Sequence, residues 1–543
     1  MKNVVKKANF KKLLNTIVGL LNEVKEREFK IEDANGKISF LKIQGMSVSI
    51  MSKVEKGYHL CNLTIDDDID DIAKSILVKI WIENEHKACE YYTARKGFSL
   101  NEENFKVFFE QEVNQWVADA YRKFFTSSSK ESKLYRKSTD VVEEHIETIS
   151  LKNDLEPEIV HLAEFVTRSA HEEIEEIRYV HSFLMSQFTV FLMVDTDGRK
   201  ILTKQNEFYS MTATIEFINA QNYRLEKELS CYVLKEEDLP KAINKLGEDI
   251  RKVVEEHKEI LFLDPEFYPI LMRPEATHTL FHEGIAGHLL SGKYIVEKIS
   301  STLKMLGKDL SQNPRFSILK EMLIENKPNL EGTIASYKYD HEGIPAKDIV
   351  LLDRGKIKNY LTDRNSAHNL KQATSNGTSL TAAFFEVKDG EAKMGTPEPR
   401  ISNLIITSYS QKTQQDLREE MKEYCKREGF DFYLEISSKA GEVNVENGNF
   451  QMKTDDCNMV SVIDGSKRKV WNGILSGKIF EFIGAIKSIS QETEEDNGMC
   501  GSDSGFIPIY AQAPYMVLEK FNFGTTDELE EVDIDLHPKS RSI

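Results

Sequence analysis

The sequence predicts an α+β protein in which helices and strands mix in the first half and strands dominate the second. Three observations support this prediction. A chain of 543 residues is too long for one hydrophobic core, so two or three domains are expected. Apolar residues make up 40% and charged residues 29%, which is the balance of a soluble globular protein. Helical and strand patterns alternate up to residue 265, and strand signals prevail after it.

The first half begins with an expected amphipathic helix. Its apolar residues recur at helical spacing: Leu13, Leu14, Ile17, Val18, Leu21 and Val24. Charged residues follow at once and no small-residue cleavage site appears, so we interpret the segment as a helix and not as a signal peptide. Residues 37–65 predict short strands separated by turns, and residues 99–125 predict a long helix opened by a capping box of Ser99 and Glu102.

Strands return over residues 188–217, where Asp197-Gly198 suits a tight hairpin turn, and a helix is expected over residues 238–256. In the second half, residues 348–361, 430–437, 458–473 and 505–523 carry strand and hairpin signals, and residues 410–429 form one inserted helix. We therefore expect an N-terminal domain over 1–265, with a polar excursion at 126–157, a C-terminal domain over 266–524 and an acidic tail over 525–543.

Charge and cysteine usage narrow the classes of function. The formal net charge of −18 repels phosphate backbones and argues against direct nucleic-acid binding. No stretch approaches about 18 uninterrupted apolar residues, so no membrane span is expected. The 6 cysteines are spread singly without a CxxC pair, which favours reduced thiols and a cytoplasmic protein.

Two histidines and a glutamate lie close together in the segment FHEGIAGHLL, residues 281–290. Neutral imidazoles bind zinc, and a carboxylate beside the metal can take a proton from bound water. In an HExxH helix the two histidines stand four residues apart and share one face. Here His282 and His288 stand six apart, which separates them by roughly 120° around a regular helix. They could still converge if Gly284 and Gly287 let the turn widen or end.

Spacing alone leaves two other interpretations open. His278 and His282 stand four apart, which is a better helical spacing for zinc. Alternatively, the segment is a helix terminus whose histidines cap or form hydrogen bonds and bind no metal. A second HEG tripeptide at 341–343 lies in a turn-like stretch and shows how easily the tripeptide arises, so we do not expect ligands there.

Four segments together resemble the TldD/PmbA family, often called modulators of DNA gyrase. They are LFHEGIAGHLLSG at 280–292, YDHEGIPAKDIVLLDRGKIKNYLTDR at 339–364, SNG at 375–377 with PEPRISNLII at 397–406, and NGMCGSDSGFIPI at 497–509. Their order and spacing match the family over residues 265–524, more loosely over 165–265, and only in general character over 1–165.

The resemblance implies an N-terminal α/β domain and a mainly β C-terminal domain that carries a metal. TldD-type members of the family are zinc metallopeptidases, so zinc is the implied cofactor. Carried over by motif, the ligands are His282, His288 and Cys500, and Glu283 is the general base. The family pattern has three residues between the glutamate and the second histidine, and this chain has four. The extra residue affects the position of His288, so His278 is the alternative ligand in its place.

Two imidazoles and one thiolate leave zinc an open position, which is the catalytic arrangement. The resemblance further implies peptide or unfolded-protein substrates, held as extended strands and cut with broad specificity. It implies a homodimer, or a heterodimer with a related family member. Arg400 and Asn403 are candidates for binding the substrate backbone, with loop stabilisation as the alternative. The alternative function is a metal-free partner subunit or scaffold of such a complex.

Overall fold

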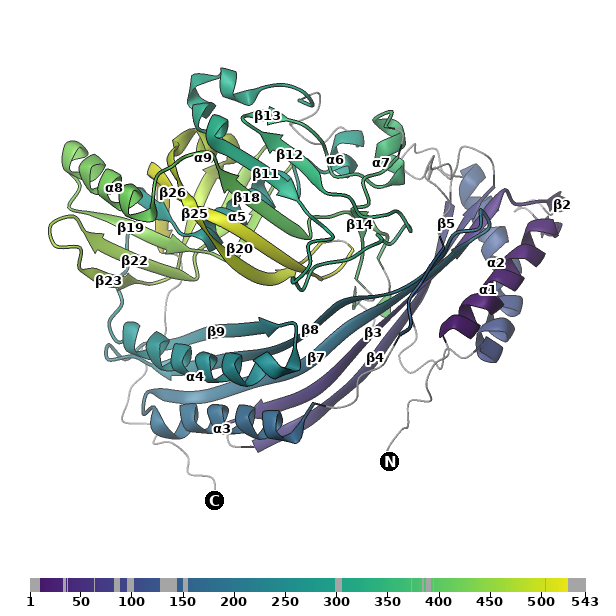
Figure 1. Ribbon diagram of the computed structural model, residues 1–543, viewed down its shortest axis with the longest axis horizontal. Coiled ribbons are helices and arrows are strands. Elements are labelled where there is room, and N and C mark those ends of the chain that lie inside the picture. The colour runs from purple at the N-terminus through teal and green to yellow at the C-terminus, as the bar shows by residue number, and fades with distance from the viewer. Residues whose placement is uncertain are drawn as a thin grey trace.

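The computed structural model of the protein describes residues 10–32, 36, 38–62, 64–82, 88–94, 102–126, 144–149, 155–297, 305–372, 374–382, 385–386, 392–393, 395–502 and 504–525. Two large β-sheets dominate it, one built from each half of the chain (Figure 1). Helices pack against both sheets, so the predicted α+β class is confirmed.

The N-terminal sheet is built from long strands. The strands of this half are β1 (Phe29–Glu32), β2 (Ile38–Leu41), β3 (Gly45–Cys61), β4 (Thr64–Trp81), β5 (Ala88–Ala94), β6 (Glu144–Ile146), β7 (Ile177–Asp195), β8 (Lys200–Ile218) and β9 (Arg224–Val233). Among the described residues, β1 and β2 form a separate hairpin, and the others form a sheet in the order β5-β4-β3-β7-β8-β6 with β9 also on β8.

Four helices cover one face of this sheet. They are α1 (Phe10–Glu26), α2 (Glu102–Thr126), α3 (Pro157–Glu173) and α4 (Leu239–Glu256). Even-numbered residues of β7 point to them: Val180 and Leu184 pack in the core of α3 and α4, and Val190 packs in the core of α1 and α2. The odd-numbered Phe191 and Met193 form a cluster on the opposite face with Tyr339 of the C-terminal half. The sheet is therefore a platform whose odd-numbered β7 face meets the C-terminal half.

The helices predicted near the N-terminus, over 99–125 and over 238–256 are confirmed as α1, α2 and α4, and the hairpin turn at Asp197-Gly198 is confirmed by Gly198 at φ 101°. The prediction of short strands over 37–65 is wrong, because most of that segment is the single 17-residue strand β3. Gly57 lies inside β3. A Cβ there would lie 1.9 Å from the carbonyl oxygen of Leu184, so glycine allows close approach of β7.

The C-terminal sheet is larger and more mixed. The strands of this half are β10 (Glu266–Met272), β11 (Met322–Asn326), β12 (Ile349–Asp353), β13 (Lys356–Ile357), β14 (Ser379–Leu380), β15 (Phe385–Glu386), β16 (Ala392–Lys393), β17 (Glu398–Pro399), β18 (Asn403–Ser408), β19 (Phe432–Ser437), β20 (Ala440–Val443), β21 (Asn449–Lys453), β22 (Asp456–Ser461), β23 (Lys467–Val470), β24 (Gly473–Lys478), β25 (Ile486–Cys500) and β26 (Ile507–Thr525). Within the described chain, the main path runs β13-β12-β11-β18-β26-β10-β19-β22-β23, and β24 and β25 also pair with β26.

The helices of this half are short except for one. They are α5 (Pro274–Phe281), α6 (Gly292–Val296), α7 (Arg364–Asn369), α8 (Gln414–Glu428) and α9 (Ile479–Ala485). The helix predicted over 410–429 is confirmed as α8, which Thr413 caps and Gly429 ends at φ 80°. Most of the predicted excursion at 126–157 and of the tail at 525–543 lies outside the described residues, and the domain boundaries stay a prediction.

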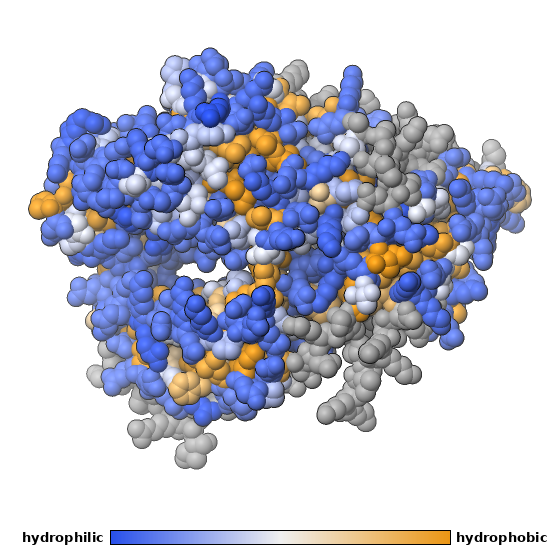
Figure 2. All heavy atoms as spheres, viewed as in Figure 1, coloured by the Kyte–Doolittle hydropathy of each residue, from blue (hydrophilic) through white to orange (hydrophobic). Residues whose placement is uncertain are grey.

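The two halves meet at separate places. At one, the turn 341–343 lies on the platform, where the buried Glu342 pairs with Lys79 of β4 at 3.3 Å. At another, Lys227 of β9 donates to the Asp455 carbonyl at 2.9 Å and to Asn472 at 2.8 Å. Figure 2 shows an opening through the molecule between the two layers. In the described part of the chain, no helix has the length and apolar character that crossing a membrane requires.

Candidate metal centre

The segment after α5 is a widened turn. Residues His282–Ala286 form a π-helical turn, in which Gly287 N–H donates to the His282 carbonyl, five residues back, at 2.9 Å. Gly287 faces backbone and leaves no room for a side chain, whereas Gly284 faces the movable end of a side chain. A Cβ on Gly287 would lie 2.7 Å from the His282 carbonyl oxygen, and one on Gly284 would lie 2.3 Å from Ile479 Cδ1. The extra residue between Glu283 and His288 is therefore absorbed by a wide turn, as the glycines suggested.

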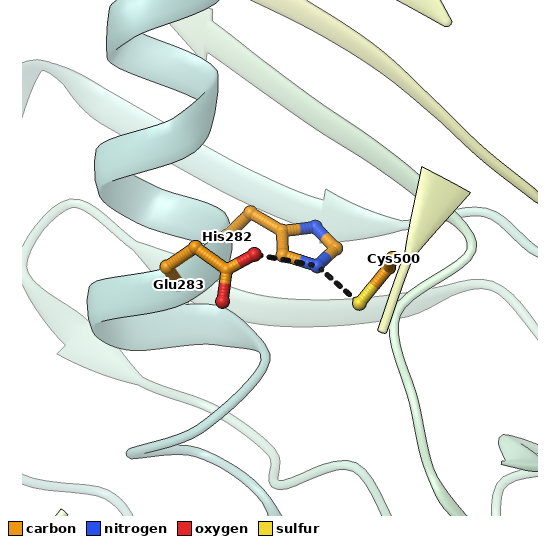
Figure 3. Close-up of side chains that lie close together, drawn as sticks. All are labelled: His282, Glu283 and Cys500. Atoms are coloured by element: carbon orange, nitrogen blue, oxygen red, sulfur yellow. Dashed lines mark hydrogen bonds and ion pairs between the residues drawn. The ribbon is translucent and has the colours of Figure 1, made fainter. Parts of the chain in front are cut away.

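Three predicted site residues converge at this turn. His282 Nε2 lies 3.1 Å from the Sγ of Cys500, which ends β25, and 3.7 Å from Oε1 of Glu283 (Figure 3). One ligand atom from each of the three residues lies within 4.8 Å of the others. His282 and Cys500 are buried, and Glu283 is partly exposed. A strand end and a widened helix end thus bring a thiol, an imidazole and a carboxylate to one point.

The other two histidines lie beside this trio and not inside it. His288 Nε2 contacts Oε2 of Glu283 at 3.0 Å, and its ring stacks on Tyr294. His278 is buried with its ring 5.4 Å from that of His282, and its Nε2 has no hydrogen-bond partner in the described chain. Burial and the charge of His282 hold the pKa of His278 well below its usual value, so its imidazole is neutral.

The mutual interactions of His282, Glu283 and Cys500 favour the charged form of each side chain, although burial opposes it. Burial opposes ionisation of Cys500, but His282 and Arg400 outweigh it and lower the pKa of the thiol to about 7. Burial also opposes the charge of His282, while Cys500 and Glu283 raise its pKa. His282 and His288 likewise overcome burial and lower the pKa of Glu283. Since thiolate is the form of cysteine that binds metals, the surroundings prepare Cys500 as a ligand.

Comparison with known proteins agrees with the fold. Residues 265–525 match the family described as PmbA/TldA metallopeptidase C-terminal domain. The crystal structure of TldE from Thermococcus kodakarensis superposes with a TM-score of 0.63 over 94% of this chain and 100% of that one. The C-terminal half of the chain belongs to the TldD/PmbA family. At 12% identity, the likeness to TldE shows the fold alone.

Curated relatives named as proteases match a little under half of this chain. A metalloprotease of Methanocaldococcus jannaschii is 24% identical over 244 residues, which are 45% of this chain and 47% of the relative. A zinc metalloprotease TldD homolog of Saccharolobus solfataricus is 23% identical over 267 residues, which are 47% of this chain and 51% of the relative. The chain spans about half the length of the curated relatives it matches. The family model named for a metallopeptidase domain covers residues 265–525, the half that holds His282 and Cys500.

The donor set of this TldD/PmbA chain fits zinc. Zinc takes cysteine sulfur and histidine nitrogen at about 2.0–2.3 Å, so two ligand atoms in a tetrahedral shell lie roughly 3.3–3.8 Å apart. The 3.1 Å from His282 Nε2 to Cys500 Sγ is slightly below that range. The imidazole and the thiol therefore need little movement to share one ion.

Arg400 was predicted as a substrate-binding candidate, and its described contacts are internal. Its Nη2 donates to the Cys500 Sγ at 3.1 Å and to the Cys500 carbonyl at 2.8 Å, while Nη1 donates to Ser504 Oγ and to the Gly505 carbonyl. Asn403 is also buried, and its amide donates to the Lys327 carbonyl at 2.8 Å. A role of either residue in substrate binding stays a prediction.

Several residues that the sequence analysis did not single out surround Cys500. Glu398 accepts hydrogen bonds from Ser502 Oγ and from the Ser504 amide, and it pairs with Lys293 of α6 at 2.6 Å. Lys293 follows the histidine turn, so this ion pair ties that turn to the loop after Cys500. The only signal in the sequence was the serine-rich run CGSDSG, whose hydroxyls need partners when buried.

Proposed function

We propose that this TldD/PmbA chain is a zinc-dependent peptidase. The observation that carries the proposal is the convergence of His282, Glu283 and Cys500 at one buried point. Relatives named metalloprotease and zinc metalloprotease support the reaction class. His282, His288 and Cys500 would hold the ion, which is the set expected from the family motifs.

The chemistry follows from the donor types. Zinc held by two imidazoles and a thiolate would supply a nucleophile from water at neutral pH and polarise the scissile carbonyl. Glu283 is ionised, because its neighbours lower its pKa, and so it can accept a proton. It would pass this proton to the leaving amine. Its Oε2 lies 3.0 Å from His288 Nε2, so the proposed base stands next to the proposed third ligand.

Extended peptides and unfolded proteins are the proposed substrates. The ligands are buried, with His282 only 2% exposed and Cys500 only 8% exposed, so a folded surface does not reach them. The opening between the two layers is the proposed entry for an extended chain (Figure 2). Recognition through its backbone would give broad sequence specificity.

A pair of family members is the proposed assembly, as a homodimer or as a heterodimer with a related chain. A metal-free partner or scaffold of such a pair is the second candidate function, as the family resemblance implies. The described donors favour the catalytic member, because His282, Glu283 and Cys500 are all present and brought together.

Zinc content and peptide cleavage separate the two candidates. We expect about one zinc at this centre, lost in Cys500→Ser and His282→Ala, with His288→Ala deciding the third ligand. Glu283→Gln keeps the shape of the side chain but removes the base, so cleavage of an unstructured fluorogenic peptide should fall about 10²–10⁴-fold while zinc stays bound. Glu442→Gln, an exposed residue on β20, is the control and should cleave normally.

Each outcome has a meaning. Zinc retained by His288→Ala with cleavage lost would assign His288 to positioning Glu283 and leave His278 as the candidate ligand. Full cleavage by Glu283→Gln would remove the proposed base. A wild-type protein that binds zinc and cleaves no unfolded peptide would favour the partner subunit.

A further inference from the structure

We propose that His59 and His181 form a second zinc site, on the N-terminal sheet and separate from the proposed catalytic centre. Their Nε2 atoms face each other in direct contact between neighbouring strands. The two rings lie with centroids 4.1 Å apart at an interplanar angle of 60°. Each ring thus directs the same nitrogen at one point, which is the arrangement two imidazoles need to clamp a cation.

The strand register creates this pair. In the antiparallel pairing of β3 with β7, Cys61 lies opposite His181 and His59 lies opposite Phe183. His59 and His181 are therefore diagonal neighbours on one face of the sheet. Both belong to long strands with partners on either side, so the scaffold holds the two side chains more firmly than a loop would.

Cys61 supplies a third donor of the type zinc prefers. It lies directly across from His181, on the same face, where paired Cβ atoms are about 4.5–5.5 Å apart. Its thiol contacts the Tyr179 hydroxyl at 3.1 Å. Rotation about its χ1 would bring the sulfur toward the two imidazoles. Cys61, His59 and His181 are all only partly buried, so an ion can reach them from solvent.

An aromatic wall orients the two imidazoles. The ring of Phe183 stacks on His59 at 4.8 Å with an interplanar angle of 12°, and it contacts His181 at 4.7 Å. The single phenyl group restrains both histidines at once, which lowers the entropy lost when they bind an ion. Such support around ligands is a regular feature of metal sites.

The site would lie on the side of the platform that meets the C-terminal half. His181 shares the odd-numbered face of β7 with Phe191 and Met193, which pack on Tyr339. An ion that joins β3 to β7 there would stiffen the platform without touching His282 or Cys500. It therefore makes a second, separable contribution to the zinc content and to the thermal stability.

The test uses the full-length chain with its proposed catalytic ligands removed. We expect the wild type to bind two zinc ions per chain after chelation and titration with zinc chloride, and His282→Ala/Cys500→Ser to retain one. Adding His59→Gln and His181→Gln to that background should abolish the remaining binding, measured by calorimetry and elemental analysis. Zinc should raise the melting temperature of the background protein and leave that of the four-fold variant unchanged.

His161→Gln is the matched control, and a second variant tests the site if the first background does not fold. His161→Gln alters a histidine of α3 that is 76% exposed, and it should change neither stoichiometry nor stability. If the background variant fails to fold, His59→Gln/His181→Gln in the wild type should lower zinc from two per chain to one. Two results would refute the second site. One is an unchanged zinc count in His59→Gln/His181→Gln, and the other is a wild type that binds one zinc, which Cys500→Ser removes. In either case His59 and His181 would share only a hydrogen bond. Either result leaves the peptidase proposal untouched.

Discussion

The guanidinium of Arg400 donates hydrogen bonds to both the thiol and the backbone carbonyl of Cys500. One amino group of the guanidinium donates to the Sγ at 3.1 Å and to the carbonyl oxygen at 2.8 Å. The other donates to Ser504 Oγ at 2.7 Å and to the Gly505 carbonyl at 3.0 Å. A single planar cation therefore fixes the thiol and the loop that follows it, and the place of the proposed ligand depends on this one side chain.

The first prediction is that Arg400→Lys weakens zinc binding and destabilises the fold. Lysine keeps the charge but cannot donate all the hydrogen bonds that the planar guanidinium donates. Some of the buried acceptors around residue 400 would therefore be left without a hydrogen-bond donor. We expect the free energy of unfolding in urea to fall by about 3 kcal/mol. Arg427→Lys on the surface of α8 is the control, and it should be neutral. Equal zinc affinity and stability in Arg400→Lys would contradict the role given to the guanidinium.

The second prediction concerns the wide turn. In Gly287→Ala the new Cβ would lie 2.7 Å from the His282 carbonyl oxygen, which is backbone and cannot move alone. The turn must then change shape and displace His282 from Cys500, so zinc content and peptide cleavage should both fall.

Gly19→Ala is the matched control for this change. Gly19 lies in α1 with nothing within 4 Å of its added Cβ. Alanine favours a helix, so this variant should gain roughly 0.5–1 kcal/mol of stability and keep its zinc. A Gly287→Ala protein with normal zinc content would show that the turn tolerates the methyl group.

Local patterns in the sequence were enough for the wide turn but not for what surrounds it. Gly284 and Gly287 indicated a turn that could widen, because glycine leaves room beside backbone. Cys500 is 218 residues away from His282, and only the resemblance of its segment to a family motif joined them. The contact of Arg400 with Cys500 spans 100 residues. It follows from the pairing of β18, which begins just after Arg400, with β26, and from the pairing of β26 with β25, which no local pattern encodes.

The lengths of the strands in the N-terminal sheet could not be predicted from local sequence. The sequence over 37–65 predicted short strands separated by turns, yet β3 runs unbroken from Gly45 to Cys61. Long neighbours on both sides supply hydrogen bonds that outweigh the local preference, and Gly57 makes room for Leu184. Strand length depended on tertiary pairing, whereas the helices α1, α4 and α8 followed from their own periodicity.

The third prediction is a pH dependence at the junction of the two halves. Glu147 accepts hydrogen bonds from the Lys204 amide, from Thr203 and from Lys338 of the C-terminal half. Burial opposes its charge, but these donors outweigh burial and lower its pKa from 4.5 to about 2. A carboxylate with a depressed folded pKa stabilises the protein fully above its unfolded value, and this contribution is lost as the pH falls through the folded value.

The pH window is therefore about 4.5 down to about 2. Urea unfolding should show Glu147→Gln to be less stable than the wild type at pH 6, with a difference that shrinks as the pH falls through this window. Glu158→Gln, an exposed residue of α3, should give no such pH-dependent difference. A constant gap between Glu147→Gln and the wild type at every pH would mean that the ion pair contributes nothing and that only packing was lost.

The last prediction is that unfolded chains are cut and folded domains are not. His282 and Cys500 are almost inaccessible, so several residues on each side of a scissile bond must be extended before the bond can approach them. The net charge of −18 should add a mild preference for basic peptides, which salt would weaken by screening. One small domain, offered in its native form and as a destabilised and largely unfolded variant, provides the comparison, with fragments followed by mass spectrometry at low and high salt. Equal cleavage of both forms would mean that the centre is open to folded surfaces. Cleavage of neither form, with zinc bound, would favour the partner subunit or a narrow peptide specificity over a general peptidase of unfolded chains.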